Sequence, residues 1–202
     1  MIRSRIVVVA IAIFLCKRAE QIAMQPNVTS QQIMDEAVIE TVLVDVLVSS
    51  DEEPKSIRRH SQISEELMFR NECYDNVFMN AGGIRSANEK WGAAKLADAA
   101  AARAAGENVL DRLKRKELHS PFKPQDKRIS IWKEPSSTQS PHQTSVRPFR
   151  VGPPGYADEN RLAVVVLFFP GTIGMLGGRT TYLLRLDGKK WNVIARDINF
   201  FA

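Results

Sequence analysis

Three runs of hydrophobic and β-branched residues lie near the C-terminus, and turn-forming residues separate them. The runs are Leu162 to Phe169, Thr180 to Leu186 and Trp191 to Phe201. Asp187-Gly188 lies between the last two runs. An Asp-Gly pair is a strong hairpin signal, because glycine accepts a positive φ and aspartate tolerates one. The pattern predicts three successive strands of an antiparallel sheet.

Two longer stretches have helical patterns. Residues 29–32 have the spacing of a capping box, and the apolar positions from there to Val48 fall on one broad face. This stretch predicts an amphipathic helix that docks on the sheet, although its valine-rich end also has strand propensity. A second capping box at residues 86–89 precedes an alanine-rich run. That run predicts a helix to about Leu118, which bends or divides at Gly106.

The residues between these elements give weaker signals. We expect a short helix at residues 64–70, a flexible break at 81–83, a short strand at 128–133, an exposed and mobile loop at 134–145 and a turn at 152–155. Residues 146–151 are typical of an edge strand, because Pro148 cannot donate a hydrogen bond to a ladder.

The chain has 202 residues, of which 44% are hydrophobic, and this is enough for one sizeable core. We therefore expect a single α+β domain over residues 26–202. Its N-terminal and central helices pack on a C-terminal antiparallel sheet.

The net charge of +5 raises the question of nucleic-acid binding. Residues 31–54 hold seven acids and no Lys or Arg, whereas residues 84–134 hold twelve basic residues and seven acids. The basic residues are densest from Arg112 to Lys116, in the last turns of a predicted helix, where cations suit the helix dipole. We find neither interleaved aromatic residues nor a known motif beside them, which argues against a nucleic-acid partner.

The first residues have the pattern of a secretory signal. Arg3 and Arg5 precede an apolar run at residues 6–16, which is too short to span a bilayer. Residues 1–25 are therefore interpreted as a signal or hydrophobic N-terminal segment, and the protein as exported to the periplasm or secreted. An uncleaved short anchor and a buried strand are the alternatives, and a cytoplasmic protein stays open.

Few residues suggest catalytic, metal or cofactor chemistry. The three histidines, His60, His119 and His142, lack a second metal ligand at a known spacing. His119 follows a predicted helix, where a cation suits the dipole. Cys73 is interpreted as a partly buried hydrophobe rather than a nucleophile. We assign no catalytic residue, no metal site and no cofactor.

The glycine-rich stretch at residues 170–180 is the strongest candidate for ligand contact. Its spacing departs from that of a P-loop, and it leads into a strand rather than a helix. We interpret it as a long hairpin connection whose glycines allow a ligand or partner to approach the backbone. The residues of this candidate loop are Gly171, Gly174, Gly177, Gly178 and Arg179.

Two further groups of residues were weighed as sites. The carboxylates of Asp158, Glu159 and Asp197 are candidates to meet in space, and paired acids would point to acid–base catalysis. The aromatic residues of the predicted strands are interpreted as sheet core rather than as a ligand box, with a small apolar pocket as the alternative. They are Trp132, Tyr182, Trp191, Phe200 and Phe201.

Four stretches carry a resemblance to known proteins: residues 147–149, 152–156, 181–184 and 188–197. Over roughly the C-terminal 80 residues the chain resembles a loose set of uncharacterised exported bacterial proteins. Its last hairpin is also similar to that of cone-shaped nuclear-transport-factor-like domains, in which helices pack on a curved antiparallel sheet. Neither resemblance implies catalytic residues.

The sequence thus favours a non-catalytic, exported binding or interaction domain that uses the concave sheet face or the glycine-rich loop. The alternative is a small hydrolase or isomerase with acids in a sheet pocket. A pocket with two close carboxylates, or a carboxylate and a histidine, would favour the enzyme. The ligand, the partner and the oligomeric state have no signal in the sequence.

Overall fold

The computed structural model describes residues 30–52, 67–133, 148–169 and 177–200. The chain divides into one unit of residues 1–33 and a second, compact unit of residues 34–202. The described elements are α2 (Ser30–Glu52), β1 (Leu67–Cys73), α4 (Val77–Ala93), α5 (Ala99–Arg115), β2 (Ile129–Ile131), β3 (Phe149–Val151), β4 (Gly155–Ala157), β5 (Leu162–Phe169), β6 (Gly178–Asp187) and β7 (Lys190–Phe200). These helices and strands confirm the predicted α+β fold, while the segment at residues 1–25 and the loop at 134–145 lie outside the described residues.

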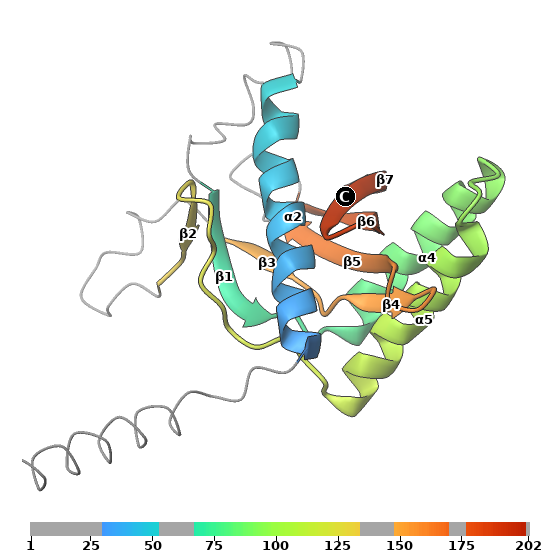
Figure 1. The fold of residues 1–202 in the computed structure, drawn as a ribbon, viewed down its shortest axis with the longest axis horizontal. Coiled ribbons are helices and arrows are strands. Elements are labelled where there is room, and N and C mark those ends of the chain that lie inside the picture. Colours follow the sequence, from blue (N-terminus) through green and yellow to red (C-terminus); the bar gives the residue numbers. More distant parts are fainter. Residues whose placement is uncertain (1–29, 53–66, 134–147, 170–176, 201–202) are drawn as a thin grey trace, which may run out of the picture. The chain divides into compact units, whose positions relative to one another are not determined.

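The strands form one mixed sheet in the order β2-β1-β3-β5-β6-β7 (Figure 1). The antiparallel C-terminal strands β5, β6 and β7 confirm the prediction, and Gly188 has the expected positive φ of 60° in their last turn. Strand β1 adds parallel pairs with β2 and β3. Strands β3 and β4 both pair with β5, and residues 152–154 separate them, whereas Gly155 of the turn predicted at residues 152–155 belongs to β4.

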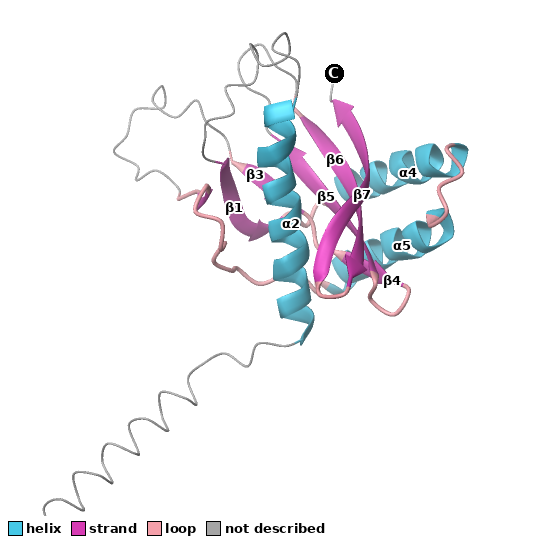
Figure 2. Cartoon of the chain, turned by 45° about the horizontal axis from the view of Figure 1, so that its top comes forward, coloured by secondary structure: helices cyan, strands magenta, loops and turns pink. Residues whose placement is uncertain are grey.

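Helix α2 covers one face of the sheet, as its amphipathic pattern predicts (Figure 2). Its buried residues Val38, Ile39, Val42, Leu43 and Leu47 belong to a core with residues of β1, β5, β6 and β7. These positions recur at helical spacing, so the helix presents one apolar stripe to the sheet.

Helices α4 and α5 cover the opposite face, but only over β4 to β7. Ile84, Ala87 and Trp91 of α4 pack with Ala102, Ala105 and Val109 of α5 on the apolar side chains of β5. The same face of β1, β2 and β3 lies outside this cover, among the residues that the structure describes.

The predicted helix at residues 86–118 is wrong in its extent and its break. It is two helices, and the chain turns at residues 94–98, where Lys95 has a φ of 52°. Gly106 lies inside α5 and does not end the helix. A Cβ at this position would collide with Cγ2 of Ile84, so the glycine lets α4 and α5 pack closely. Residues 86–89 lie inside α4, which is capped instead by the Asn76 side chain.

Two predictions about the residues before that helix are also wrong. Residues 67–70 belong to strand β1, not to a short helix, because Leu67 and Phe69 alternate into the α2 core. Residues 81–83 are helical rather than a flexible break. A Cβ on Gly82 would lie 2.8 Å from Nη1 of Arg179, so these glycines let α4 approach β6.

Strand β3 is not the predicted edge strand. It lies between β1 and β5 in the sheet, and Pro148 comes just before its first residue. Pro148 has no N–H group, but because it lies outside β3 no hydrogen bond of the described ladder is lost.

Candidate functional site

Two arginines and two aromatic rings lie on the uncovered part of the sheet face, and a third ring, the buried Phe168, belongs to the part that α4 and α5 cover. Phe69 of β1 is opposite Ile131 of β2 and Phe149 of β3, so the following residues Trp132, Arg70 and Arg150 share the other face. Arg150 is in turn opposite Phe168 of β5. We call the group of Arg70, Trp132, Tyr74, Arg150 and Phe168 the arginine–aromatic row.

Each arginine of the row lies over an aromatic ring. Arg70 Cζ is 5.6 Å from the centre of the Trp132 ring, and Arg150 Cζ is 5.5 Å from the centre of the Tyr74 ring. Tyr74 also packs on Phe168, with 4.3 Å between the ring centres. A guanidinium over a ring is held by cation–π attraction while the N–H groups on its rim stay available for an acceptor.

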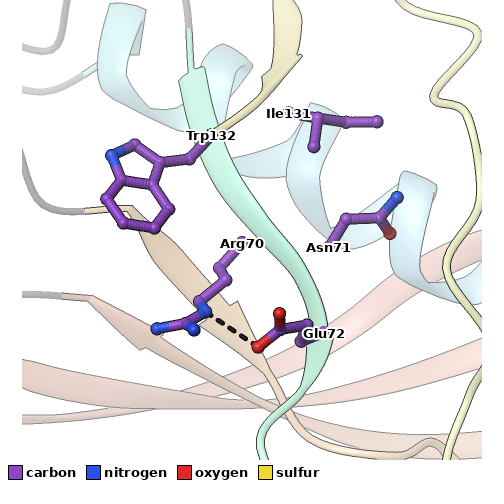
Figure 3. Close-up of a pocket in the computed structure, with 5 residues that line it drawn as sticks. All are labelled: Arg70, Asn71, Glu72, Ile131 and Trp132. Carbon is purple, nitrogen blue, oxygen red and sulfur yellow. Dashed lines mark hydrogen bonds and ion pairs between the residues drawn. The ribbon is translucent and has the colours of Figure 1, made fainter. Parts of the chain in front are cut away.

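A shallow pocket opens beside Arg70 at the end of β2 (Figure 3). Its lining residues are Arg70, Asn71, Glu72, Ile131 and Trp132, and its volume is about 170 Å³. Arg70 Nε donates to Glu72 Oε2 at 2.9 Å, and both side chains lie on the same side of β1 as Trp132. The volume is below the 300–1,000 Å³ that is usual for small-molecule sites.

Arg150 differs from Arg70 in its partners. It is exposed, and its guanidinium has no hydrogen bond or ion pair to any residue that the structure describes. Arg70 is half-buried and holds the exposed Glu72 carboxylate. The row therefore presents one guanidinium with a carboxylate partner and one without a polar partner among the described residues.

A second polar group is buried between α2, α5 and β4. Arg112 binds both oxygens of Asp35, at 3.0 and 2.7 Å, and Tyr156 Oη donates to Asp35 at 2.9 Å. Arg112 also donates to the backbone oxygens of Pro154 and Glu117. Asp35 and Arg112 are 2% and 6% exposed, so the pair has no contact with solvent that would serve catalysis.

The burial of this pair has no counterpart among the sequence predictions. Arg112 belongs to the basic stretch at residues 112–116, where a cation suits the helix dipole, yet Arg112 and Asp35 are both buried. Burial and the neighbouring Asp35 carboxylate raise the pKa of Tyr156, so its hydroxyl stays protonated and donates. The group fixes the position of α2 against α5.

Cys73 and His119 lie next to this pair, and neither has the properties of a catalytic group. Burial raises the pKa of Cys73 to about 12, so the side chain is a thiol at neutral pH, in agreement with its interpretation as a small hydrophobe. Burial lowers the pKa of His119, which is only 6% exposed. His119 is therefore neutral rather than the cation that its position after a helix suggested.

We expect the burial of His119 to make stability fall in mild acid. Its pKa is lower in the folded than in the unfolded protein, so protons bind the unfolded chain first and the free energy of unfolding decreases as the pH drops below about 6.5. The slope from this residue approaches about 1.4 kcal/mol per pH unit. Urea unfolding at pH 7, 6 and 5 measures it. An equal slope in wild type and His119→Gln would contradict the assignment.

The structure describes only part of the predicted glycine-rich loop. Gly171 and Gly174 lie outside the described residues, and Gly177, Gly178 and Arg179 lead into β6. Arg179 turns toward α4, where its Nη1 donates to the Met79 carbonyl at 3.2 Å. Gly178 has no room for a side chain, because a Cβ would lie 2.5 Å from the Asn199 carbonyl oxygen. Ligand binding by this loop stays a prediction.

The three carboxylates weighed from the sequence are not brought together. Asp158 and Glu159 lie in the turn between β4 and β5, whereas Asp197 is opposite Thr181 in the β6–β7 ladder. Asp197 forms an ion pair with Lys90 of α4 and accepts from Asn199 at 2.7 Å. No group of three potential metal ligands occurs within the described ranges.

The aromatic residues of the strands divide between core and surface. Tyr182 and Trp191 are buried as predicted, at 3% and 5% exposure. Phe200 is 68% exposed, and Trp132 lies in the arginine–aromatic row rather than in the core, so the interpretation is wrong for these two. Phe201 lies outside the described residues.

No helix in the described part of the chain is both long and apolar enough to cross a bilayer. No protein-family model, curated protein or solved structure matches the sequence.

Proposed function

We propose that this protein is a non-catalytic interaction domain that binds a partner polypeptide at the arginine–aromatic row. The observation that carries the proposal is Arg150, which lies stacked on Tyr74 and exposed, without a polar partner among the described residues. Arginine and aromatic side chains are enriched where proteins bind one another. The adjoining pocket has room for a side chain of a partner rather than for a whole small molecule.

The enzyme alternative has less support among the described residues. Of the described residues that line the pocket, Glu72 alone has a carboxylate, and Arg70 binds it. The acid that lies near a histidine, Asp35, is buried and held by Arg112 and Tyr156. A general acid or base must reach its substrate, and this carboxylate has no such access.

Site-specific cross-linking tests the proposal. A photo-reactive benzoylphenylalanine replaces Ser130, which is opposite Met68 and shares the face of the row, in protein expressed in the native host. We expect cross-links to a partner identified by mass spectrometry, and their loss when Arg150→Gln is added. The matched control carries the same probe at Arg103, an exposed residue of α5. Equal cross-linking from both positions, or none from position 130, would refute binding at this face.

We also propose that the protein is exported, on the support of Arg3, Arg5 and the apolar run at residues 6–16. Cell fractionation followed by N-terminal sequencing of the mature protein is expected to find it outside the cytoplasm, with a new N-terminus after residue 16. Recovery of the chain from the cytoplasm with Met1 in place would contradict export.

A further inference from the structure

We infer that the partner segment bound at the arginine–aromatic row is acidic, that its carboxylate is received by Arg150 and Arg70, and that Glu72 competes for Arg70 in the free protein. This inference rests on the proposed function and names the chemistry of the partner.

The positions of the two arginines favour an anion between them. Phe69 is opposite Phe149 and Cys73 is opposite Val151, so Arg70 and Arg150 lie on one face of adjacent parallel strands, in a segment where the register shifts. Like charges on adjacent strands repel each other, and a carboxylate between them reduces the repulsion. A guanidinium presents two parallel N–H groups to a carboxylate, a geometry that a lysine cannot provide.

Glu72 has the position of an internal competitor. It is the acid that the structure places against Arg70, and its side chain is 68% exposed. Exposed ion pairs contribute little free energy, so a partner carboxylate can displace this one. Displacement leaves Glu72 in water, where its charge is fully solvated.

The same features favour an acidic polypeptide over a nucleic acid. Single-stranded nucleic acids are bound by grooves that combine many cations with a series of stacking rings. The row offers two guanidiniums, and its ring Phe168 is only 6% exposed, so it has few cations and few exposed rings for such a ligand.

Fluorescence anisotropy with a fluorescein-labelled hexaglutamate peptide and the full chain at low ionic strength tests the inference. We expect Arg150→Gln to weaken binding at least about tenfold and Glu72→Gln to strengthen it about threefold, because this change frees Arg70. Arg70→Gln should weaken binding as well. The matched control Arg103→Gln removes the same charge from an exposed site on α5 and should leave the affinity within about twofold. Circular dichroism verifies that each variant is folded.

Several outcomes would overturn the inference. They are no binding of hexaglutamate, equal binding of a hexaglutamine peptide, an equal loss in Arg150→Gln and Arg103→Gln, and weaker binding in Glu72→Gln. Tighter binding of a labelled twelve-nucleotide oligothymidylate that depends on Arg150 would replace the acidic polypeptide with a nucleic acid. If cross-links form from position 130 while hexaglutamate does not bind, the proposed interaction domain is supported and the acidic nature of its partner is refuted. If both experiments fail, both proposals fall.

Discussion

Arg112→Met is expected to lower the free energy of unfolding by about 3–5 kcal/mol in urea denaturation. The substitution removes both guanidinium contacts from the Asp35 carboxylate, which is 2% exposed, and it removes the donor to Pro154 and Glu117. A buried charge without its counterion costs more than the pair gains when it is intact, and this asymmetry gives the effect its size.

Two further variants separate this cause from a simple loss of charge. Asp35→Leu combined with Arg112→Met removes both charges, so its cost is expected to be well below the sum of the two single costs. Arg103→Met removes an exposed arginine from the same helix and should change stability by less than about 0.5 kcal/mol. Additive costs in the double variant would show that the two side chains act independently.

Gly155→Ala is expected to lower the free energy of unfolding by at least about 2 kcal/mol, because there is no space for the new methyl group. A Cβ at this position of β4 would lie 2.5 Å from the backbone nitrogen of Val109 and would also collide with the carbonyl oxygen of Ala105. Both obstacles belong to the backbone of α5, so only a shift of the helix can relieve them. Thermal unfolding measures the loss.

Gly92→Ala is the matched control for Gly155→Ala. Gly92 lies in the last turn of α4, and nothing lies within 4 Å of a Cβ built there. Alanine should therefore stabilise the protein by about 0.5–1 kcal/mol through its higher helix propensity. Similar losses in both variants would mean that the contact between β4 and α5 is looser than the structure indicates.

The parts of the fold that were predictable are those in which one local signal dominates. Asp187-Gly188 marks the last hairpin, in which Gly188 and Lys189 form the two-residue connection and Asp187 pairs with Lys190. The stripe from Val38 to Leu47 predicts α2 because a helix on a sheet needs one continuous apolar face.

The sequence predictions are wrong where tertiary contacts override the local conformational preference of the residues. Gly82 and Gly83 weaken a helix in isolation, yet α4 runs through them because the Arg179 side chain occupies the space of their missing side chains. Arg112 resembles its exposed neighbours in sequence, and only Asp35, 77 positions away in the chain, explains its burial.

The arginine–aromatic row was missed for a similar reason. The alternation in β1 carries a usable signal, because Leu67 and Phe69 are apolar while Arg70 and Glu72 are charged. The helix predicted at residues 64–70 is not compatible with this alternation. Arg70 and Arg150 lie on adjacent strands because β1 pairs in parallel with β3, and no local pattern specifies this pairing.

Because helices cover only part of one sheet face, we expect the strands to differ in how fast their amide hydrogens exchange. Strand β5 is buried on both faces, so its amides should exchange only through global unfolding. Strand β2 pairs through three residues, and helices cover it on one face at most among the described residues, so it should open at lower cost. A partner bound at the row would therefore slow amide exchange mainly in β1 and β2, so binding would stabilise the strands that the helices leave uncovered on one face.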